Sequence, residues 1–269
     1  MSNFKVGLQL YSVRDKMEKD MDATLKAVKD AGYDCVEFAG FFDKKPKEVK
    51  ALLEKYNLSC YSIHHNVAEF LGDVEKGLEY IKELGVKYFA IPHYSIDEYL
   101  TNWDETIEKF KNLEKILSDN NVQLLYHNHD FEFTKVDGEY IIDKLYKEIP
   151  GMSPEFDVCW VEYGGENACE YLKKYSDKID VIHFKDFDCK ELAGGPVYEL
   201  IGVDSKAKKE DNEFKFKPLG RGRQNWDAII ETAKEIDAEI IIVEQDNWYD
   251  DDSMNCAKLS REFLESKGI

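Results

Sequence analysis

Hydrophobic and polar positions alternate along the chain with two different periods. Short apolar runs rich in β-branched and aromatic residues predict buried strands. Between them lie longer stretches in which apolar residues recur every three or four positions. One example is "DATLKAVKDAG" (22–32), where Leu25 and Val28 share a face and Gly32 follows the last turn. These stretches predict amphipathic helices.

Strands and helices alternate from one end of the chain to the other. The predicted strands span residues 5–13, 35–40, 58–65, 88–94, 122–129, 154–160, 180–187 and 239–246. The predicted helices span 22–32, 46–57, 73–85, 103–121, 139–149, 166–178, 225–237 and 255–268. Such alternation predicts parallel pairing, because each helix returns the chain to the starting edge of the sheet. Eight units within about 250 residues predict a (β/α)8 TIM barrel, with residues 1–269 as a single domain.

Two features refine this prediction. A doubly wound open sheet is the alternative, but the first strand-to-helix turn, "LYSVRDKMEKD" (10–20), has no Gly-rich phosphate loop. The segment 188–224 is irregular, with two glycines and a proline at 194–196 and the charged stretch "DSKAKKEDNEF" (204–214). It is too long for an ordinary connection, so we expect an inserted loop over the site.

Composition narrows the class of partner. The formal net charge of -19 and the absence of a Lys/Arg cluster oppose binding to nucleic acid and to anionic membranes, so a small-molecule ligand is expected. The six cysteines are dispersed without a CxxC pair, which is typical of reduced thiols. The first residues lack the pattern of a secretory signal, and no apolar run is long enough to span a membrane. A cytoplasmic protein is therefore predicted.

Polar side chains gather where the predicted strands end. They include all six histidines, His64, His65, His93, His127, His129 and His183, together with Glu37, Asp157, Lys185, Asp186, Glu244 and Asp246. In a barrel of this kind the carboxyl ends of the strands form the active site. Any one of these residues alone can be read as a polar group that merely ends a strand. As a set on one barrel, they are predicted to converge on a single mouth.

Imidazoles and carboxylates from separate strands are suited to a divalent ion of the Mn, Mg, Zn or Co type. The period-two alternation of strands also places neighbours on one face. His183 and Lys185 share a face, as do Glu244 and Asp246, and as do His127 and His129. Each pair can supply one metal ligand and one group that faces the substrate.

Other chemistries have weaker support. No GxSxG nucleophile elbow occurs, and no cysteine stands beside a histidine in the sequence. The stretch "GRGRQNW" (220–226) lacks both a preceding apolar strand and the P-loop lysine, so we expect a turn in which Arg221 or Arg223 meets an anionic or hydroxyl-rich ligand. The run "DNWYDDDS" (246–253) predicts a polar loop and a helix start, with Trp248 and Tyr249 available as a wall for sugar stacking.

Six stretches in order resemble the sugar phosphate isomerase/epimerase family of the xylose-isomerase-like barrels. They are "GLQLYSVRD" (7–15), "YHNHDFEF" (126–133), "FDVCW" (156–160), "HFKD" (183–186), "PLGRGRQNWDAI" (218–229) and "VEQD" (243–246). The resemblance implies one divalent metal, manganese first, with Mg, Co or Zn as alternatives. The implied ligands are Glu132, Asp157, His183 and Glu244. The first of them is open, since either Glu132 or His127 can occupy that position, and we favour Glu132.

The resemblance also implies a chemistry. The metal would bind a carbonyl and its neighbouring hydroxyl, and a carboxylate, Glu132 or Glu244, would remove the proton from carbon to form an enediolate. The remaining implied residues are His64 and Lys185 as catalytic groups and His129, His93, Arg221 and Trp248 as substrate-binding groups. Return of the proton gives isomerisation or epimerisation.

Four functions compete at this point. The first is an isomerase or epimerase of a ketose or keto-sugar, and the second is a lyase on the same scaffold, such as an inosose or dehydroshikimate dehydratase or an enzyme that cleaves 3-keto-glycosides. The third, a DNA-repair relative of endonuclease IV, needs more ligands, and the acidic surface opposes it. The fourth is a sugar-binding barrel without turnover. A homo-oligomer is a further expectation from the family.

Overall fold

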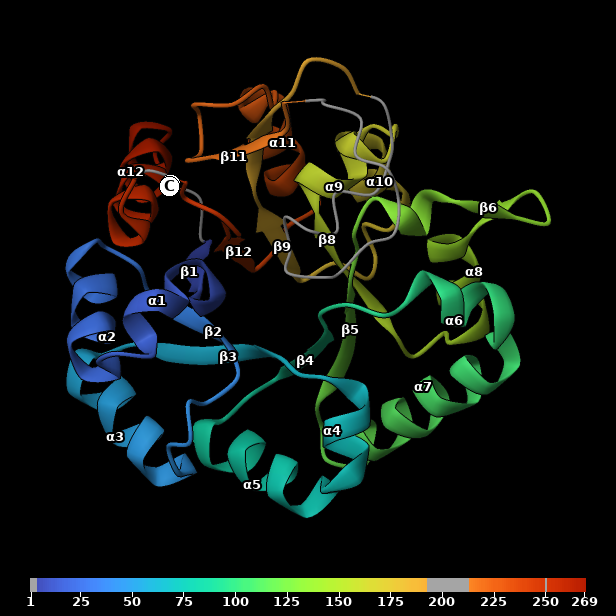
Figure 1. Ribbon diagram of the computed structural model, residues 1–269, viewed down its shortest axis with the longest axis horizontal. Coiled ribbons are helices and arrows are strands. Elements are labelled where there is room, and N and C mark those ends of the chain that lie inside the picture. The colour runs from blue at the N-terminus through green and yellow to red at the C-terminus, as the bar shows by residue number, and fades with distance from the viewer. Residues whose placement is uncertain (1–3, 193–212, 250) are drawn as a thin grey trace.

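A closed barrel of parallel strands forms the centre of the molecule (Figure 1). The computed structural model describes residues 4–192, 213–249 and 251–269. The barrel strands are β1 (Lys5–Gln9), β2 (Cys35–Ala39), β3 (Ser59–His64), β4 (Tyr88–Ile91), β5 (Gln123–His127), β8 (Ser153–Asp157), β9 (Val181–Phe184) and β12 (Ile240–Val243). Each pairs in parallel with the next in this order, and β12 closes the ring against β1. The predicted (β/α)8 architecture is confirmed.

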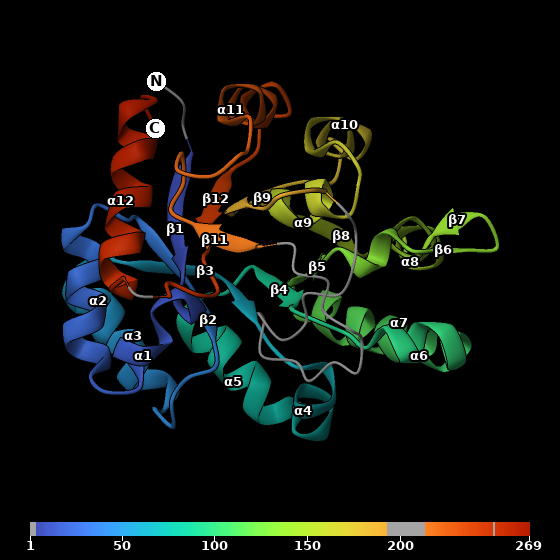
Figure 2. The same ribbon diagram turned by 45° about the horizontal axis from the view of Figure 1, so that its top comes forward.

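Helices surround the barrel and connect its strands (Figures 1 and 2). They are α1 (Arg14–Met17), α2 (Met21–Asp30), α3 (Pro46–Tyr56), α4 (Val67–Gly72), α5 (Val74–Leu84), α6 (Ile96–Thr101), α7 (Trp103–Ser118), α8 (Ile141–Glu148), α9 (Val158–Tyr163), α10 (Ala168–Lys174), α11 (Trp226–Glu235) and α12 (Ser253–Ser266), with 3-10 turns η1 (Leu10–Val13) and η2 (Phe131–Phe133). Their apolar faces pack on the outside of the strands in one continuous core. This packing holds the strand ends in fixed positions.

All eight barrel strands end before the last residue of the predicted runs, and in two of them a side chain caps the turn that follows. The first stops at Gln9, whose side chain accepts a hydrogen bond from the backbone of Tyr11 and starts a 3-10 turn. The sixth stops at Asp157, whose carboxylate accepts from the backbone N–H groups of Cys159 and Trp160 and caps α9. In both places a side-chain cap overrides the β propensity of the following residues.

The segment predicted as an inserted loop is described only at its two ends, because residues 193–212 lie outside the described residues. The ends form an antiparallel ribbon of β10 (Asp186–Asp188) and β11 (Lys215–Lys217). A second ribbon joins β6 (Lys135–Val136) to β7 (Glu139–Tyr140). Figure 2 shows the second ribbon beside α8, which it contacts.

The turn "GRGRQNW" is held by Asp186. Its carboxylate accepts hydrogen bonds from the backbone of Gly220 and Gly222 and from the indole of Trp226. A Cβ at Gly222 would lie 2.2 Å from Asp186 Oδ1, so only glycine fits there. The predicted turn is present, and Asp186 has a structural part in it.

No helix in the described ranges is long and apolar enough to cross a membrane.

Candidate metal centre

Four buried side chains meet at the carboxyl ends of the strands. We call them the upper set: His127, the last residue of β5; Asp157, the last of β8; His183 in β9; and Glu244, directly after β12. The register places Asp157 opposite His183 and His183 opposite Ile242, two residues before Glu244. Because parallel strands point the same way, these four residues arrive at one level of the barrel.

The donor atoms of the upper set are close enough for one cation. His127 Nε2 lies 3.3 Å from Asp157 Oδ2 and 3.5 Å from Glu244 Oε2. His183 Nδ1 lies 3.0 Å from Glu244 Oε2. One donor atom from each of the four residues falls within 4.8 Å of every other. Two imidazole nitrogens and two carboxylate oxygens suit Mn²⁺, Co²⁺ or Zn²⁺.

The hydrogen bonding of the upper set fits a metal centre. Among the described residues, His127 Nδ1 is buried without a hydrogen-bond partner, and its Nε2 has only the longer contacts with the carboxylates of Asp157 and Glu244. A buried imidazole left in this state loses the energy of its hydrogen bonds, about 1–3 kcal/mol for each unsatisfied group. A cation at this place would take up a nitrogen of His127 and an oxygen of Asp157. The residues present therefore fit the metal that the family resemblance implies.

Lys185 provides the positive charge beside this set. Its Nζ lies 2.8 Å from Asp157 Oδ2, 3.0 Å from Glu244 Oε2 and 3.1 Å from Asp246 Oδ2. Burial alone would lower the pKa of Lys185, but the three carboxylates hold it well above its ordinary value. Burial would raise the pKa of Glu244 and of Asp157, yet Lys185 holds both below the ordinary range. Burial raises the pKa of Asp246 to about 7.

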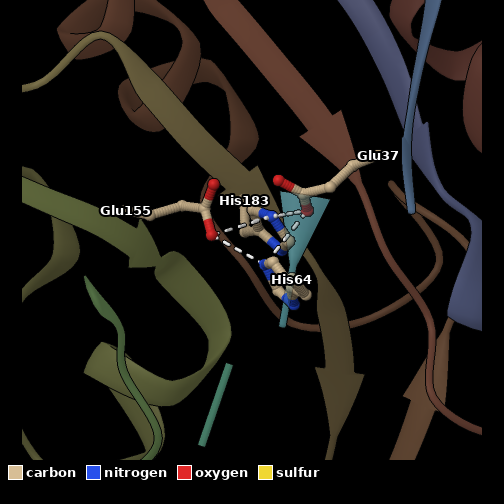
Figure 3. A group of neighbouring side chains, drawn as sticks. All are labelled: Glu37, His64, Glu155 and His183. Atoms are coloured by element: carbon tan, nitrogen blue, oxygen red, sulfur yellow. Dashed lines mark hydrogen bonds and ion pairs between the residues drawn. The ribbon is translucent and has the colours of Figure 1, made fainter. Parts of the chain in front are cut away.

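A second group lies deeper in the barrel and shares His183. We call it the lower set: Glu37 of β2, His64 of β3, Glu155 of β8 and His183 (Figure 3). Burial would raise the pKa of Glu37, but His64 and His183 hold it well below its ordinary value. Burial would lower the pKa of His64, whereas Glu37 and Glu155 raise it to about 10. Burial raises the pKa of Glu155. The lower set is thus a network of buried ion pairs.

The structure does not bring Glu132 into either set. Its Oε1 accepts a hydrogen bond of 2.6 Å from Tyr126, and its Oε2 accepts one of 2.7 Å from the backbone of His129. Burial raises the pKa of Glu132 to about 8. The turn η2 carries this carboxylate to the backbone N–H of His129, and His127 takes the place in the upper set that the resemblance assigned to Glu132. Between the two alternatives, the geometry favours His127.

A cavity of about 360 Å³ opens next to the upper set. The described residues that line it are Tyr11, Ala39, Gly40, His64, His65, Asn66, Glu69, Pro92, His93, His127, His129, Lys185, Glu244 and Asp246. The expected groups His64, His93, His129, Lys185 and Glu244 are therefore brought together at one opening. Glu132, Arg221 and Trp248 are not among the described lining residues.

The two other predicted substrate-binding residues lie elsewhere. Arg221 is exposed in the turn held by Asp186. Trp248 packs against the guanidinium of Arg14, which lies 4.9 Å from its ring and also donates to the backbone of Asp246. Neither position could be read from sequence, because each depends on where a loop folds back.

Glu155 was not among the residues predicted from the sequence. Glu37 was predicted only as a polar group at a strand end, without a role. In "PEFDV" the glutamate at 155 stands two places before Asp157, so period-two alternation puts both on the inner face of β8. A carboxylate inside an otherwise buried strand was the available signal.

Known proteins resemble this chain in sequence and in fold. The chain is 24% identical over 191 residues to an inosose dehydratase of Geobacillus kaustophilus, and the match spans 61% of this chain and 61% of that enzyme's length. The fold resembles a sugar phosphate isomerase/epimerase of Parabacteroides distasonis, with a TM-score of 0.78, 20% identity and coverage of 99% and 95% of the two chains. It also resembles a D-allulose 3-epimerase of Methylomonas sp., with a TM-score of 0.66, 14% identity and 99% coverage of both chains.

These similar proteins are described as enzymes with epimerase or dehydratase activity, and at these identities the structural likeness concerns the fold. The pattern of the family described as "Xylose isomerase-like TIM barrel" matches residues 25–267, which is most of the chain. The protein belongs to the xylose isomerase-like TIM barrel family.

Proposed function

We propose that the protein is a divalent-metal-dependent isomerase or epimerase of a ketose or keto-sugar. The observation that carries this proposal is the upper set, a buried group of two imidazoles and two carboxylates at the side of a cavity large enough for a monosaccharide. The match to the family and the epimerase fold of the Methylomonas protein support it. A cytoplasmic location and a homo-oligomer remain predictions.

His127, Asp157, His183 and Glu244 would hold the metal. When bound, a divalent ion, Mn²⁺ in the first place, supplies Lewis-acid stabilisation of the negative charge that develops on the substrate oxygens. We assign the role of base to Glu244, because it belongs to the upper set and also lines the cavity. Its carboxylate removes the proton from the carbon next to the carbonyl.

Lys185 is the proposed proton donor for the oxygen of the substrate. Its ammonium lies 3.0 Å from Glu244 Oε2, faces the same cavity and carries a proton at neutral pH because the surrounding carboxylates raise its pKa. A charged donor beside the developing oxygen anion stabilises the transition state more than the ground state. Glu132, which does not line the cavity, is assigned a supporting part through Tyr126 and His129.

The other histidines at the cavity would orient hydroxyl groups. Burial lowers the pKa of His129 well below its ordinary value, with His127 adding to the effect, and burial also lowers the pKa of His93. Both rings are therefore neutral near pH 7 and can each donate and accept a hydrogen bond. His64 Nε2 is engaged by Glu37 and Glu155, which leaves the edge of the ring toward the cavity.

The lining favours a substrate without a phosphate group. Among the described lining residues, Lys185 is the single lysine or arginine, and three carboxylates already surround it. Glu69, Glu244 and Asp246 add negative charge to the same wall. Such a wall repels a phosphate dianion and accepts hydroxyl groups as hydrogen-bond donors.

Exchange of carbon-bound hydrogen tests the proposed reaction. The full chain loaded with Mn²⁺ is incubated in deuterated water with a panel of free ketoses and 3-keto-sugars, and the products are read by NMR and mass spectrometry. Incorporation of deuterium at the carbon next to the carbonyl, together with an isomer of unchanged composition, is the expected result. Absence of both exchange and product across the panel, with metal bound, would contradict the proposal.

A dehydratase is the second candidate, favoured by the sequence similarity to inosose dehydratase. The same enediolate loses a β-hydroxyl group as water if the ammonium of Lys185, which lines the cavity, protonates the leaving oxygen. The two reactions differ in mass, because elimination releases water and isomerisation does not. Loss of the mass of one water from a keto-inositol, with no isomer formed, would assign the chain to this second reaction.

A further inference from the structure

The lower set combines the same donor types as the upper set. Glu37, His64, Glu155 and His183 come from four different strands, and each is buried. Glu155 precedes Asp157 by two residues on β8, which places it about 6.6 Å farther from the mouth along the strand. Figure 3 shows the two carboxylates facing each other across two imidazole rings, which stack with centroids 5.1 Å apart.

Nitrogen and oxygen alternate around the centre of the lower set. His64 Nε2 lies 2.7 Å from Glu155 Oε2 and 3.1 Å from Glu37 Oε2. His183 Nε2 lies 2.8 Å from Glu37 Oε2 and 3.5 Å from Glu155 Oε2. Ligands at the bond lengths of tetrahedral Zn²⁺ are about 3.3 Å from one another. The four atoms therefore stand nearly at the spacing of a tetrahedral ligand shell.

We propose that the lower set binds a second divalent cation, of the Zn²⁺ or Co²⁺ type, beneath the upper one. Two atoms support a cation beyond the ion pairs themselves, because Glu37 Oε1 and Glu155 Oε1 are buried without a hydrogen-bond partner among the described residues. Gln9 Nε2 donates to Glu37 Oε2 over 2.7 Å and orients that carboxylate, as outer residues do at metal sites.

Charge balance points in the same direction. Five buried carboxylates lie in the two sets and around Lys185, namely those of Glu37, Glu155, Asp157, Glu244 and Asp246. Among the described residues, Lys185 is the one lysine that contacts any of them. With both cations bound, His64 and His127 are neutral and His183, which binds through both ring nitrogens, has lost its ring proton. Five carboxylates and one imidazolate against one ammonium leave five negative charges, of which two divalent cations balance four.

His183 connects the two sites. Its Nδ1 faces Glu244 in the upper set, and its Nε2 faces Glu37 and Glu155 in the lower set. Binding of both cations would release the ring proton of His183, so that one ring nitrogen is available to each cation. His64 lines the cavity and is 7% exposed, so it offers the route by which an ion reaches the lower set.

Metal stoichiometry tests the proposal without a substrate. The metal-free full chain is titrated with Co²⁺, the bound metal is counted by elemental analysis, and the visible spectrum reports four-coordinate nitrogen and oxygen ligation. Glu155→Gln and Asp157→Asn form a matched pair, because each removes one fully buried carboxylate from the same strand, one from each set. The expected result is two Co²⁺ per wild-type chain, one in each variant and none in the double variant.

Each other outcome has a definite meaning. One Co²⁺ per chain that Asp157→Asn abolishes and Glu155→Gln retains would overturn the second site and leave the proposed function intact. One Co²⁺ that only Glu155→Gln abolishes would support the lower site and overturn the upper one. Circular dichroism checks that the variants fold, and His64→Gln replaces Glu155→Gln if the latter does not.

Discussion

The upper and lower sets are built from the same donors but obtain their counter-charge differently. The upper set opens to the cavity, and the ammonium of Lys185 balances its carboxylates. The lower set lies beneath it and, among the described residues, reaches the cavity only through His64, and its carboxylates are balanced by the imidazoles that they contact. A lysine on a flexible stem can give way to another cation or to a substrate. Imidazoles fixed on neighbouring strands can give up a ring proton to a cation but stay in place, so we expect reactivity above and rigidity below.

Turnover gives the largest contrast between the two sets. Glu244→Gln removes the proposed base and a ligand of the upper set, so the rate of deuterium exchange should fall at least about 10²- to 10⁴-fold. Glu155→Gln, in the lower set, should reduce the rate far less. Exchange kinetics by NMR measure both. The exposed Glu231→Gln on α11 serves as the control for a charge change alone. Equal losses in the two buried variants would remove the functional distinction between the sets.

Stability of the metal-free chain is the second contrast. Lys185→Met leaves three carboxylates of the upper region without their ammonium, which should cost about 3–5 kcal/mol in the free energy of unfolding. Added Mn²⁺ should stabilise this variant more than it stabilises the wild type, since the cation replaces the missing charge. Urea unfolding with and without metal measures both effects. A variant as stable as the wild type without metal would show that the carboxylates are protonated rather than paired.

The affinity for Mn²⁺ can decide whether His127 or Glu132 is a ligand of the upper set. In a Glu155→Gln background only the upper set is complete, so bound metal reports on it alone. His127→Asn should weaken Mn²⁺ binding by more than about 100-fold. If Glu132 only supports His129, Glu132→Gln should weaken Mn²⁺ binding by at most about 10- to 100-fold. Competition with a chelating dye measures the affinities. The reverse order would identify Glu132 as the ligand and require its carboxylate to leave Tyr126.

A pH dependence of stability tests the protonation of Glu132 by itself. Burial raises the pKa of Glu132 from its ordinary value of 4.5 to about 8, so the folded chain binds this proton more tightly than the unfolded chain does. The stabilisation of the folded chain by this bound proton is fully present below pH 4.5 and is lost as the pH rises through about 8. Glu132→Gln should flatten this part of the profile. Urea midpoints across the window measure it, and an unchanged slope would exclude a titration of Glu132.

Much of the fold and part of the site followed from sequence pattern. The alternation of apolar runs and amphipathic stretches predicted all eight barrel strands, because period two and period 3.6 are local properties of the chain. The placement of Asp157, His183 and Glu244 at or near the carboxyl ends of strands was also local. Since parallel strands bring these ends to one face, the meeting of those three residues was predictable from the order of the strands.

The sequence by itself therefore determined the barrel, its polar mouth and the chemical class of the donors. Only the tertiary structure decided that His127 joins the upper set while Glu132 hydrogen-bonds to Tyr126, two residues in one short stretch. The tertiary structure alone also placed Arg221 and Trp248 outside the described lining of the cavity. It alone brought Glu37 and Glu155 together through their contacts with His64 and His183. The physical reason is that periodicity sets which way a side chain points, whereas barrel closure and strand register set what it meets.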